Sequence, residues 1–144
     1  MAEKTIDIAS PILSRNERLA DQLRQRFNET NTYVINVLSS PGSGKTTTIL
    51  GTNERLRDKA GLRCAVIEGD IASDVDAITM KEAGMPAIQI NTGGLCHLEG
   101  NMIMEAVDAF DQAVGLQNID VIFIENVGNL VCPVDFDLGE NLSI

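Results

Sequence analysis

Tryptophan is absent from this chain of 144 residues, and aromatic residues make up only 3% of it, so its core must be aliphatic. Positive charge is also scarce, because 11 Lys and Arg stand against 21 Asp and Glu, a net charge of −10. Nucleic acids and anionic membrane surfaces attract proteins through surplus Lys and Arg, so this balance argues against both as partners. A compact polyanion held by one local cationic loop remains compatible with it.

Cysteine is scarce as well, with three residues, Cys64, Cys96 and Cys132. They are too few and too scattered for the disulfide framework of a small secreted protein. No basic segment precedes an apolar stretch near the N-terminus, and no apolar run is long enough to cross a membrane. These absences indicate a reduced, cytoplasmic protein, and the length predicts a single domain over residues 1–144.

Apolar residues recur along the chain at the spacings of helices and buried strands. The pattern predicts helices over residues 11–28, 46–59, 74–83 and 99–110, and strands over residues 33–38, 64–68, 87–90 and 121–124. In the third helix, Val75, Ile78 and Met80 are the apolar members. Alternating strands and helices imply right-handed crossovers, and therefore an α/β fold with a mainly parallel sheet flanked by helices. After Val127 the sequence has no strong periodicity, so no further strand is predicted there.

A glycine-rich segment, SSPGSGKT at residues 39–46, lies between a predicted buried strand and a predicted helix. Small residues let several backbone N–H groups approach a phosphate, and the helix N-terminus adds partial positive charge. The strict P-loop pattern begins with glycine where this chain has Ser39, but residues 42–47 build most of the anion cradle. The segment predicts a nucleotide phosphate site formed by Gly42, Ser43, Gly44, Lys45, Thr46 and Thr47.

Individual residues take roles around such a nucleotide. Lys45 can bridge the β- and γ-phosphate oxygens, and the Thr46 hydroxyl can ligate Mg²⁺. Glu125 and Asp70 follow predicted strands, at the edge of a parallel sheet where ligands bind, so both are predicted to lie beside Mg²⁺. Lys45, Asp70 and Glu125 are therefore the predicted catalytic residues, and Gly128 can offer its N–H to the γ-phosphate. The alternative for Asp70 and Glu125 is a solvated acid at a strand end.

A possible metal site begins at Cys96 and His97, the only histidine of the chain. Thiolate and imidazole bind nickel, zinc and copper, although a cysteine is often only a small buried hydrophobe. We expect Cys96 and Cys132 at the same edge of the sheet as the phosphates. Neighbouring side chains in extended backbone point in opposite directions, so Cys96 and His97 are not expected to bind one ion within one chain. A metal site shared across a nucleotide-dependent homodimer is the consequence.

Four segments together resemble the hydrogenase nickel-incorporation GTPase family, HypB: SSPGSGKT, VIEGD, AIQINTGGLCHLE and VIFIENVGNLVCPVDFDLGE. The resemblance covers about residues 14–140. It implies a slow, switch-like GTPase that uses GTP and Mg²⁺ and dimerises with nucleotide. It also implies that Cys96, His97 and Cys132 bind Ni²⁺ or Zn²⁺, and that nickel is delivered to the hydrogenase large subunit together with other nickel-maturation proteins.

The family's guanine-reading Asn-Lys-x-Asp motif is missing, since the chain contains no Asn-Lys dipeptide. We therefore expect an incomplete P-loop GTPase domain that lacks the C-terminal strands and leaves strand 33–38 as an open sheet edge. Such a chain is expected to bind GTP weakly, to discriminate poorly against ATP and to associate. The alternatives are an ATP-using P-loop kinase and a metal-binding fragment without efficient nucleotide turnover.

Overall fold

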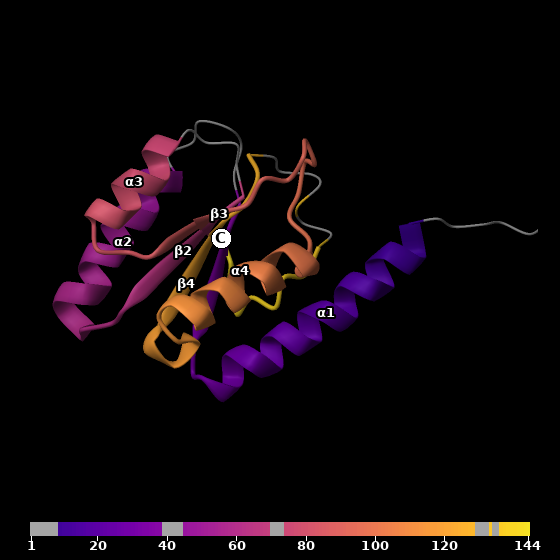
Figure 1. Ribbon diagram of the computed structural model, residues 1–144, viewed down its shortest axis with the longest axis horizontal. Helices are drawn as coiled ribbons and strands as arrows, with labels where there is room; N and C mark the ends of the chain where they lie inside the picture. The colour runs from indigo at the N-terminus through magenta and orange to yellow at the C-terminus, as the bar shows by residue number, and fades with distance from the viewer. Residues whose placement is uncertain (1–8, 39–44, 70–73, 129–132, 134–135) are drawn as a thin grey trace, which may run out of the picture.

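A five-stranded parallel sheet with strand order β3-β2-β4-β1-β5 forms the centre of the computed structural model (Figure 1). The structure describes residues 9–38, 45–69, 74–128, 133 and 136–144. The strands are β1 (Tyr33–Val37), β2 (Cys64–Glu68), β3 (Ala87–Gln89), β4 (Val121–Glu125) and β5 (Leu142–Ser143). The helices are α1 (Ala9–Glu29), α2 (Lys45–Ala60), α3 (Asp74–Glu82), α4 (Gly100–Ala113) and the short 3-10 helix η1 (Leu116–Asn118).

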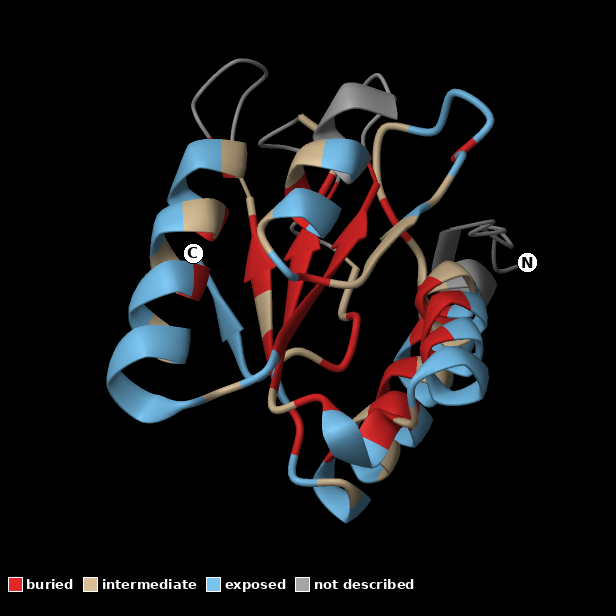
Figure 2. Ribbon diagram, turned by 60° about the vertical axis from the view of Figure 1, so that its left-hand side comes forward, coloured by how far each residue is buried: buried red, intermediate tan, exposed pale blue. Residues whose placement is uncertain are grey.

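Helices cover both faces of the sheet, with α2 and α3 on one side and α1 and α4 on the other (Figure 1). Each side has its own apolar cluster, which alternate residues of the strands supply. Ile67 and Ile124 pack with Phe110 of α4, whereas Val66 and Phe123 pack with Ile49 of α2. Every residue of β2 and β4 is buried, as in Figure 2, because inner strands of a parallel sheet are covered on both faces.

The predicted α/β architecture is confirmed, and the eight expected elements agree with the structure to within a few residues. The apolar members of α3 differ in their burial. Ile78 is 54% exposed, while Met80 of the same helix is fully buried. Residues two apart on a helix differ by about 200° in direction, so both cannot face the sheet. The side chain of Val75 lies outside the described residues. No helix in the described part of the chain is long and apolar enough to span a membrane.

The expectation that β1 forms an open sheet edge is wrong, because β5 pairs with it in parallel. Ile35 is the register partner of Leu142, and Asn36 that of Ser143. The pairing continues beyond β5, where the N–H of Leu38 donates to the carbonyl of Ile144 at 2.7 Å. A strand of two exposed residues has no recognisable hydrophobic period, so the segment after Val127 carried no strand signal.

Polar contacts fasten α1 to the rest of the domain. Asn16 is buried, and its amide donates to the carbonyl of Asp137 at 2.7 Å while its oxygen accepts the N–H of Gly100 at 2.6 Å. One side chain therefore connects α1 to the first residue of α4 and to the C-terminal segment. Nearby, Arg24 donates to both carboxylate oxygens of Asp137, at 2.9 and 2.7 Å.

Replacing Asn16 with alanine should lower the free energy of unfolding by roughly 2–4 kcal/mol, because it removes two hydrogen bonds and leaves the buried N–H of Gly100 without its acceptor. Asn28→Ala is the matched control, since Asn28 is exposed on the same helix. Denaturant unfolding measures both. Equal losses for the two variants would contradict a docking role for Asn16.

The ion pair between Arg24 and Asp137 predicts a pH dependence of stability. Burial works to raise the pKa of Asp137, but hydrogen bonds from Arg24 and from the Gly139 N–H outweigh it and hold this pKa below its ordinary value of 3.8. Such a carboxylate stabilises the fold above its unfolded-state pKa, and the contribution disappears as the pH falls through the lower folded-state pKa. The stability difference between the wild type and Asp137→Asn should therefore be largest near pH 6 and shrink below pH 3.8. Denaturant unfolding at several pH values measures it, and a constant difference would contradict the assignment.

Candidate functional site

Two buried carboxylates end neighbouring strands at the carboxyl edge of the sheet. Glu68 of β2 and Glu125 of β4 are register partners, and they are only 1% and 4% exposed. Register partners on parallel strands project to the same face, which here is the side of α2. A backbone hydrogen bond also connects the ends of the two strands, since the N–H of Gly69 donates to the carbonyl of Glu125 at 2.8 Å. Two carboxyl groups thus lie side by side where the sheet meets the start of α2.

The start of α2 brings a cation and a hydroxyl to this edge. Lys45 is the first residue of the helix and is 7% exposed. The Thr46 hydroxyl donates to Oε1 of Glu125 at 3.2 Å. A hydroxyl and a carboxylate are oxygen ligands of the kind that Mg²⁺ prefers, so the donor set fits a magnesium ion. Thr47, in the same turn of the helix, is exposed.

The backbone beyond β4 is held by a buried amide pair. Nδ2 of Asn126 donates to Oδ1 of Asn36 at 3.0 Å, and the N–H of Asn126 donates to the carbonyl of Val37 at 3.1 Å. These bonds tie the chain after Glu125 to β1, and Gly128 follows two residues later. Five predicted site residues lie outside the described residues, namely Gly42, Ser43, Gly44, Asp70 and Cys132.

Cys96 and His97 form a close pair, and the expectation that their side chains point in opposite directions is wrong. Sγ of Cys96 and Nδ1 of His97 lie 3.7 Å apart. Opposite directions follow from extended backbone, but residues 96 and 97 form a bend between β3 and α4. The alternation rule therefore does not apply at this place.

The separation of this pair tests whether it fits one metal ion. A thiolate and an imidazole nitrogen bound tetrahedrally to one zinc ion stand about 3.5 Å apart, from metal–ligand distances near 2.3 and 2.0 Å. The observed 3.7 Å is close to that value, so the two donors fit a single thiophilic cation. No group of three or more metal-binding side chains occurs within the described part of the chain.

Two further residues surround His97. Nε2 of His97 lies 3.0 Å from Oε1 of Glu99, and its ring stacks on Phe136 with centroids 3.9 Å apart. Burial works to lower the pKa of His97, but interactions with Cys96 and Glu99 outweigh it and raise this pKa above its ordinary value.

The sequence alone did not identify Glu68, Glu99 and Phe136 as site residues. A carboxylate ending a wholly apolar strand is a signal that could have found Glu68. The position of Glu99 two residues after the only histidine is a weaker signal. For Phe136, far away in sequence, the chain offers no local signal.

The cysteine–histidine loop touches the loop that leaves β2. A Cβ placed on Gly69 would lie 2.5–2.6 Å from the end of the Leu98 side chain, which is fully buried. Gly69 leads directly into Asp70 along the chain, and Leu98 follows His97. The predicted nucleotide side and the predicted metal side are therefore in contact through one glycine and one leucine.

The parallel sheet, the helix that starts at Lys45 and the Thr46–Glu125 contact at the carboxyl edge define a P-loop nucleotide-binding domain of the α/β class. The model of the CobW/HypB/UreG nucleotide-binding domain matches residues 33–139. The chain belongs to this family, and within it to the HypB family.

Relatives and solved structures agree with that assignment. The hydrogenase/urease maturation factor HypB of Helicobacter hepaticus is 44% identical over 99% of this chain and 57% of its own length. The hydrogenase maturation factor HypB of Escherichia coli is 46% identical over 95% of this chain and 45% of its own length. The crystal structure of HypB from Helicobacter pylori in complex with nickel superposes with a TM-score of 0.80 at 40% identity, covering 90% of this chain and 58% of that one. The chain thus spans about half the length of the curated relatives it matches.

Gly69→Ala should lower the free energy of unfolding by about 1–3 kcal/mol, because the new methyl group overlaps a fully buried leucine. Gly51→Ala is the matched control. Gly51 lies inside α2 with nothing within 4 Å of a built Cβ, so this change should stabilise the protein by about 0.5–1 kcal/mol. Thermal and denaturant unfolding measure both changes, and effects of the same sign would contradict the close contact of Gly69 with Leu98.

Proposed function

We propose that this chain is a metal-binding GTPase domain that delivers nickel during the maturation of nickel–iron hydrogenase. Its state is set by GTP and Mg²⁺, its hydrolysis is slow and switch-like, and two copies share a Ni²⁺ or Zn²⁺ site. The hydrogenase large subunit and other nickel-maturation proteins are its partners. The observation that carries the proposal is a chain of contacts between the two halves: Glu125 accepts from the Thr46 hydroxyl and from the N–H of Gly69. Gly69 in turn packs against Leu98, which follows the Cys96–His97 pair.

The nucleotide half of the proposal rests on the start of α2. Backbone amides of residues 42–47 cradle the phosphates, Lys45 neutralises the β- and γ-phosphate charge, and Gly128 offers an N–H to the γ-phosphate. Thr46, Asp70 and Glu125 would hold Mg²⁺, which would screen the phosphate charge. The 3.2 Å contact between Thr46 and Glu125 supports this, since both oxygens already converge.

The metal half rests on the Cys96–His97 pair, with Cys132 as a further ligand. Pro133, next to Cys132 in sequence, is buried, and its carbonyl accepts the N–H of Phe136, the residue that stacks on His97. Thiolate and imidazole select nickel or zinc over magnesium, so the cargo ion and the nucleotide ion are separated by ligand chemistry. A second copy of the chain would complete the coordination.

The contact between Gly69 and Leu98 supports coupling of the two halves. Any movement of the backbone after β2 that the nucleotide causes would be passed to Leu98, because this buried leucine packs directly against Gly69. GTP would favour the arrangement that builds the shared metal site, and loss of the γ-phosphate would release the metal.

Lys45→Ala should weaken GTP binding at least about tenfold, because charge-assisted hydrogen bonds to phosphate contribute roughly 1.5–3 kcal/mol each. Lys59→Ala is the control, since Lys59 lies exposed in the last turn of the same helix. Calorimetric titrations of GTP and ATP with Mg²⁺ measure the effect. Because the chain has no Asn-Lys-x-Asp element, we expect weak GTP binding with little discrimination against ATP.

Ni²⁺ binding is measured on the same protein with and without GTP, while light scattering records its mass. We expect coupled binding of both ligands with doubling of the mass, and loss of nickel binding in Cys96→Ala. The buried Cys64, at the opposite end of β2, provides the control variant Cys64→Ala. A preference for ATP would favour a kinase instead, and metal binding independent of nucleotide would favour a metal-binding fragment.

A further inference from the structure

Glu99 occupies a helix N-cap without acting as a cap. It precedes α4 with extended backbone, and its carbonyl accepts the N–H groups of Met102 and Ile103, yet its side chain makes no capping hydrogen bond. Short polar residues such as Ser, Asp and Asn are preferred at this position, because their oxygens reach the first helical N–H groups. Here the side chain turns instead to His97, at 3.0 Å from Nε2.

This hydrogen bond decides which ring nitrogen of His97 carries the proton. An ionised carboxylate only accepts hydrogen bonds, so Nε2 must donate. In the neutral imidazole the proton is then on Nε2, and the lone pair is on Nδ1. Nδ1 is the nitrogen that lies 3.7 Å from Sγ of Cys96. The lone pair therefore faces the neighbouring sulfur, where a shared ion would bind.

Other contacts restrict the orientation of the ring and of the carboxylate. The interplanar angle between His97 and Phe136 is 11°, so stacking limits rotation of the imidazole. The backbone behind Glu99 is held where the N–H of Gly100 donates to Asn16. His97 and Glu99 are only 13% and 28% exposed, so water competes weakly for their hydrogen bond.

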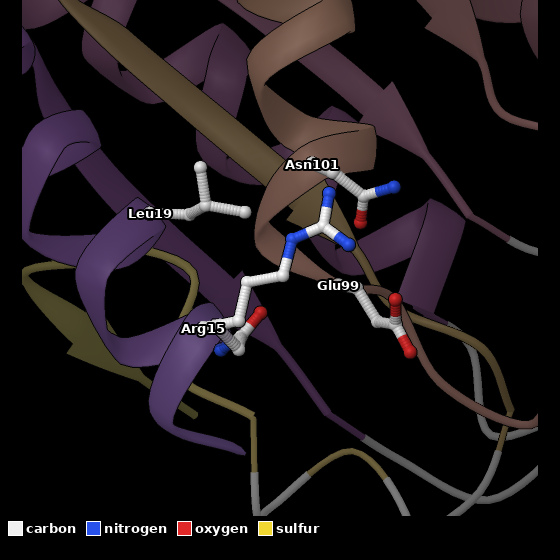
Figure 3. A pocket seen from close by; sticks show the side chains of 5 residues that line it. Arg15, Leu19, Glu99 and Asn101 are labelled. Carbon is white, nitrogen blue, oxygen red and sulfur yellow. The ribbon is translucent and has the colours of Figure 1, made fainter. Parts of the chain in front are cut away.

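A pocket of about 200 Å³ opens beside Glu99, lined by Arg15, Asn16 and Leu19 of α1 and by Asn101 of α4. In Figure 3 the Arg15 guanidinium extends across this pocket toward Glu99 and Asn101. Side chains of α1 and α4 thus line the space beside Glu99.

We propose that Glu99 is the positioning residue of the metal site: it holds His97 as the Nε2–H tautomer, so that Nδ1 and the Cys96 sulfur face one Ni²⁺ or Zn²⁺ ion together. This inference rests on the proposed function for the identity of the ion. The tautomer of His97, in contrast, is a property of the metal-free chain and does not depend on which ion binds. Carboxylates that orient a ligating imidazole in this way raise metal affinity without touching the metal.

The tautomer is measured directly, because His97 is the only histidine of the chain and its ring signals need no assignment. Long-range proton–nitrogen correlation spectra of the metal-free protein at pH 9 should show the Nε2–H form. Glu99→Ala should give a mixture of tautomers, whereas Glu99→Gln, whose amide oxygen can still accept, should restore the single form. Glu105→Ala, an exposed glutamate on α4, should leave the spectrum unchanged. An Nδ1–H form in the wild type, or no change in Glu99→Ala, would overturn the proposal.

Nickel titration supplies the second measurement. Glu99→Ala should weaken Ni²⁺ binding about 10- to 100-fold while keeping sulfur-to-nickel charge-transfer absorption, because Cys96 is intact. Glu99→Gln should recover most of that affinity, and Glu105→Ala should match the wild type. Unchanged nickel affinity in Glu99→Ala would overturn the positioning role even if the tautomer shifts. No nickel binding by the wild type would instead reject the proposed metal function, and the spectra would still decide the tautomer.

Discussion

Parallel pairing of β4 with both β1 and β2 is the constraint on which the rest of the molecule depends. Parallel strands end at the same edge of a sheet, so every loop with chemistry-bearing residues leaves the sheet on one side. The strand register is one example, because it places Glu68 of β2 directly beside Glu125 of β4. Glu125, which accepts the hydrogen bond from Thr46, is therefore positioned by the pairing of its own strand.

Close packing turns this shared edge into one connected region. Gly69 has no room for a side chain because Leu98 fills the space against it, and Leu98 lies next to His97. On the far side, Asn16 holds the first residue of α4 and the carbonyl of Asp137. The bend that carries Cys96 and His97 is therefore fixed from two directions, by β2 and by α1. These contacts hold the bend in the shape that keeps the two donor atoms 3.7 Å apart.

Local patterns were enough for much of this architecture. The strand at residues 64–68 was predicted with its observed ends, because a short apolar run with β-branched residues is typical of a buried parallel strand. The helix of residues 11–28 also followed from its apolar stripe. β5 did not, since its two residues are exposed and its pairing with β1 comes from backbone hydrogen bonds that leave no mark on the sequence. The apolar residues of α3 likewise do not say which side of this short helix faces inward, and the structure buries Met80 while Ile78 stays exposed.

The sequence by itself determined the order of strands and helices, the phosphate-loop motif and the presence of one thiol–imidazole dipeptide, because each is written in neighbouring residues. Only the tertiary structure decided that Cys96 and His97 face the same way, that Glu99 turns from its helix to the imidazole, and that Phe136 stacks on that ring. Those relations depend on a backbone bend and on segments that meet only after the sheet has formed. Distance along the chain carries no information about them.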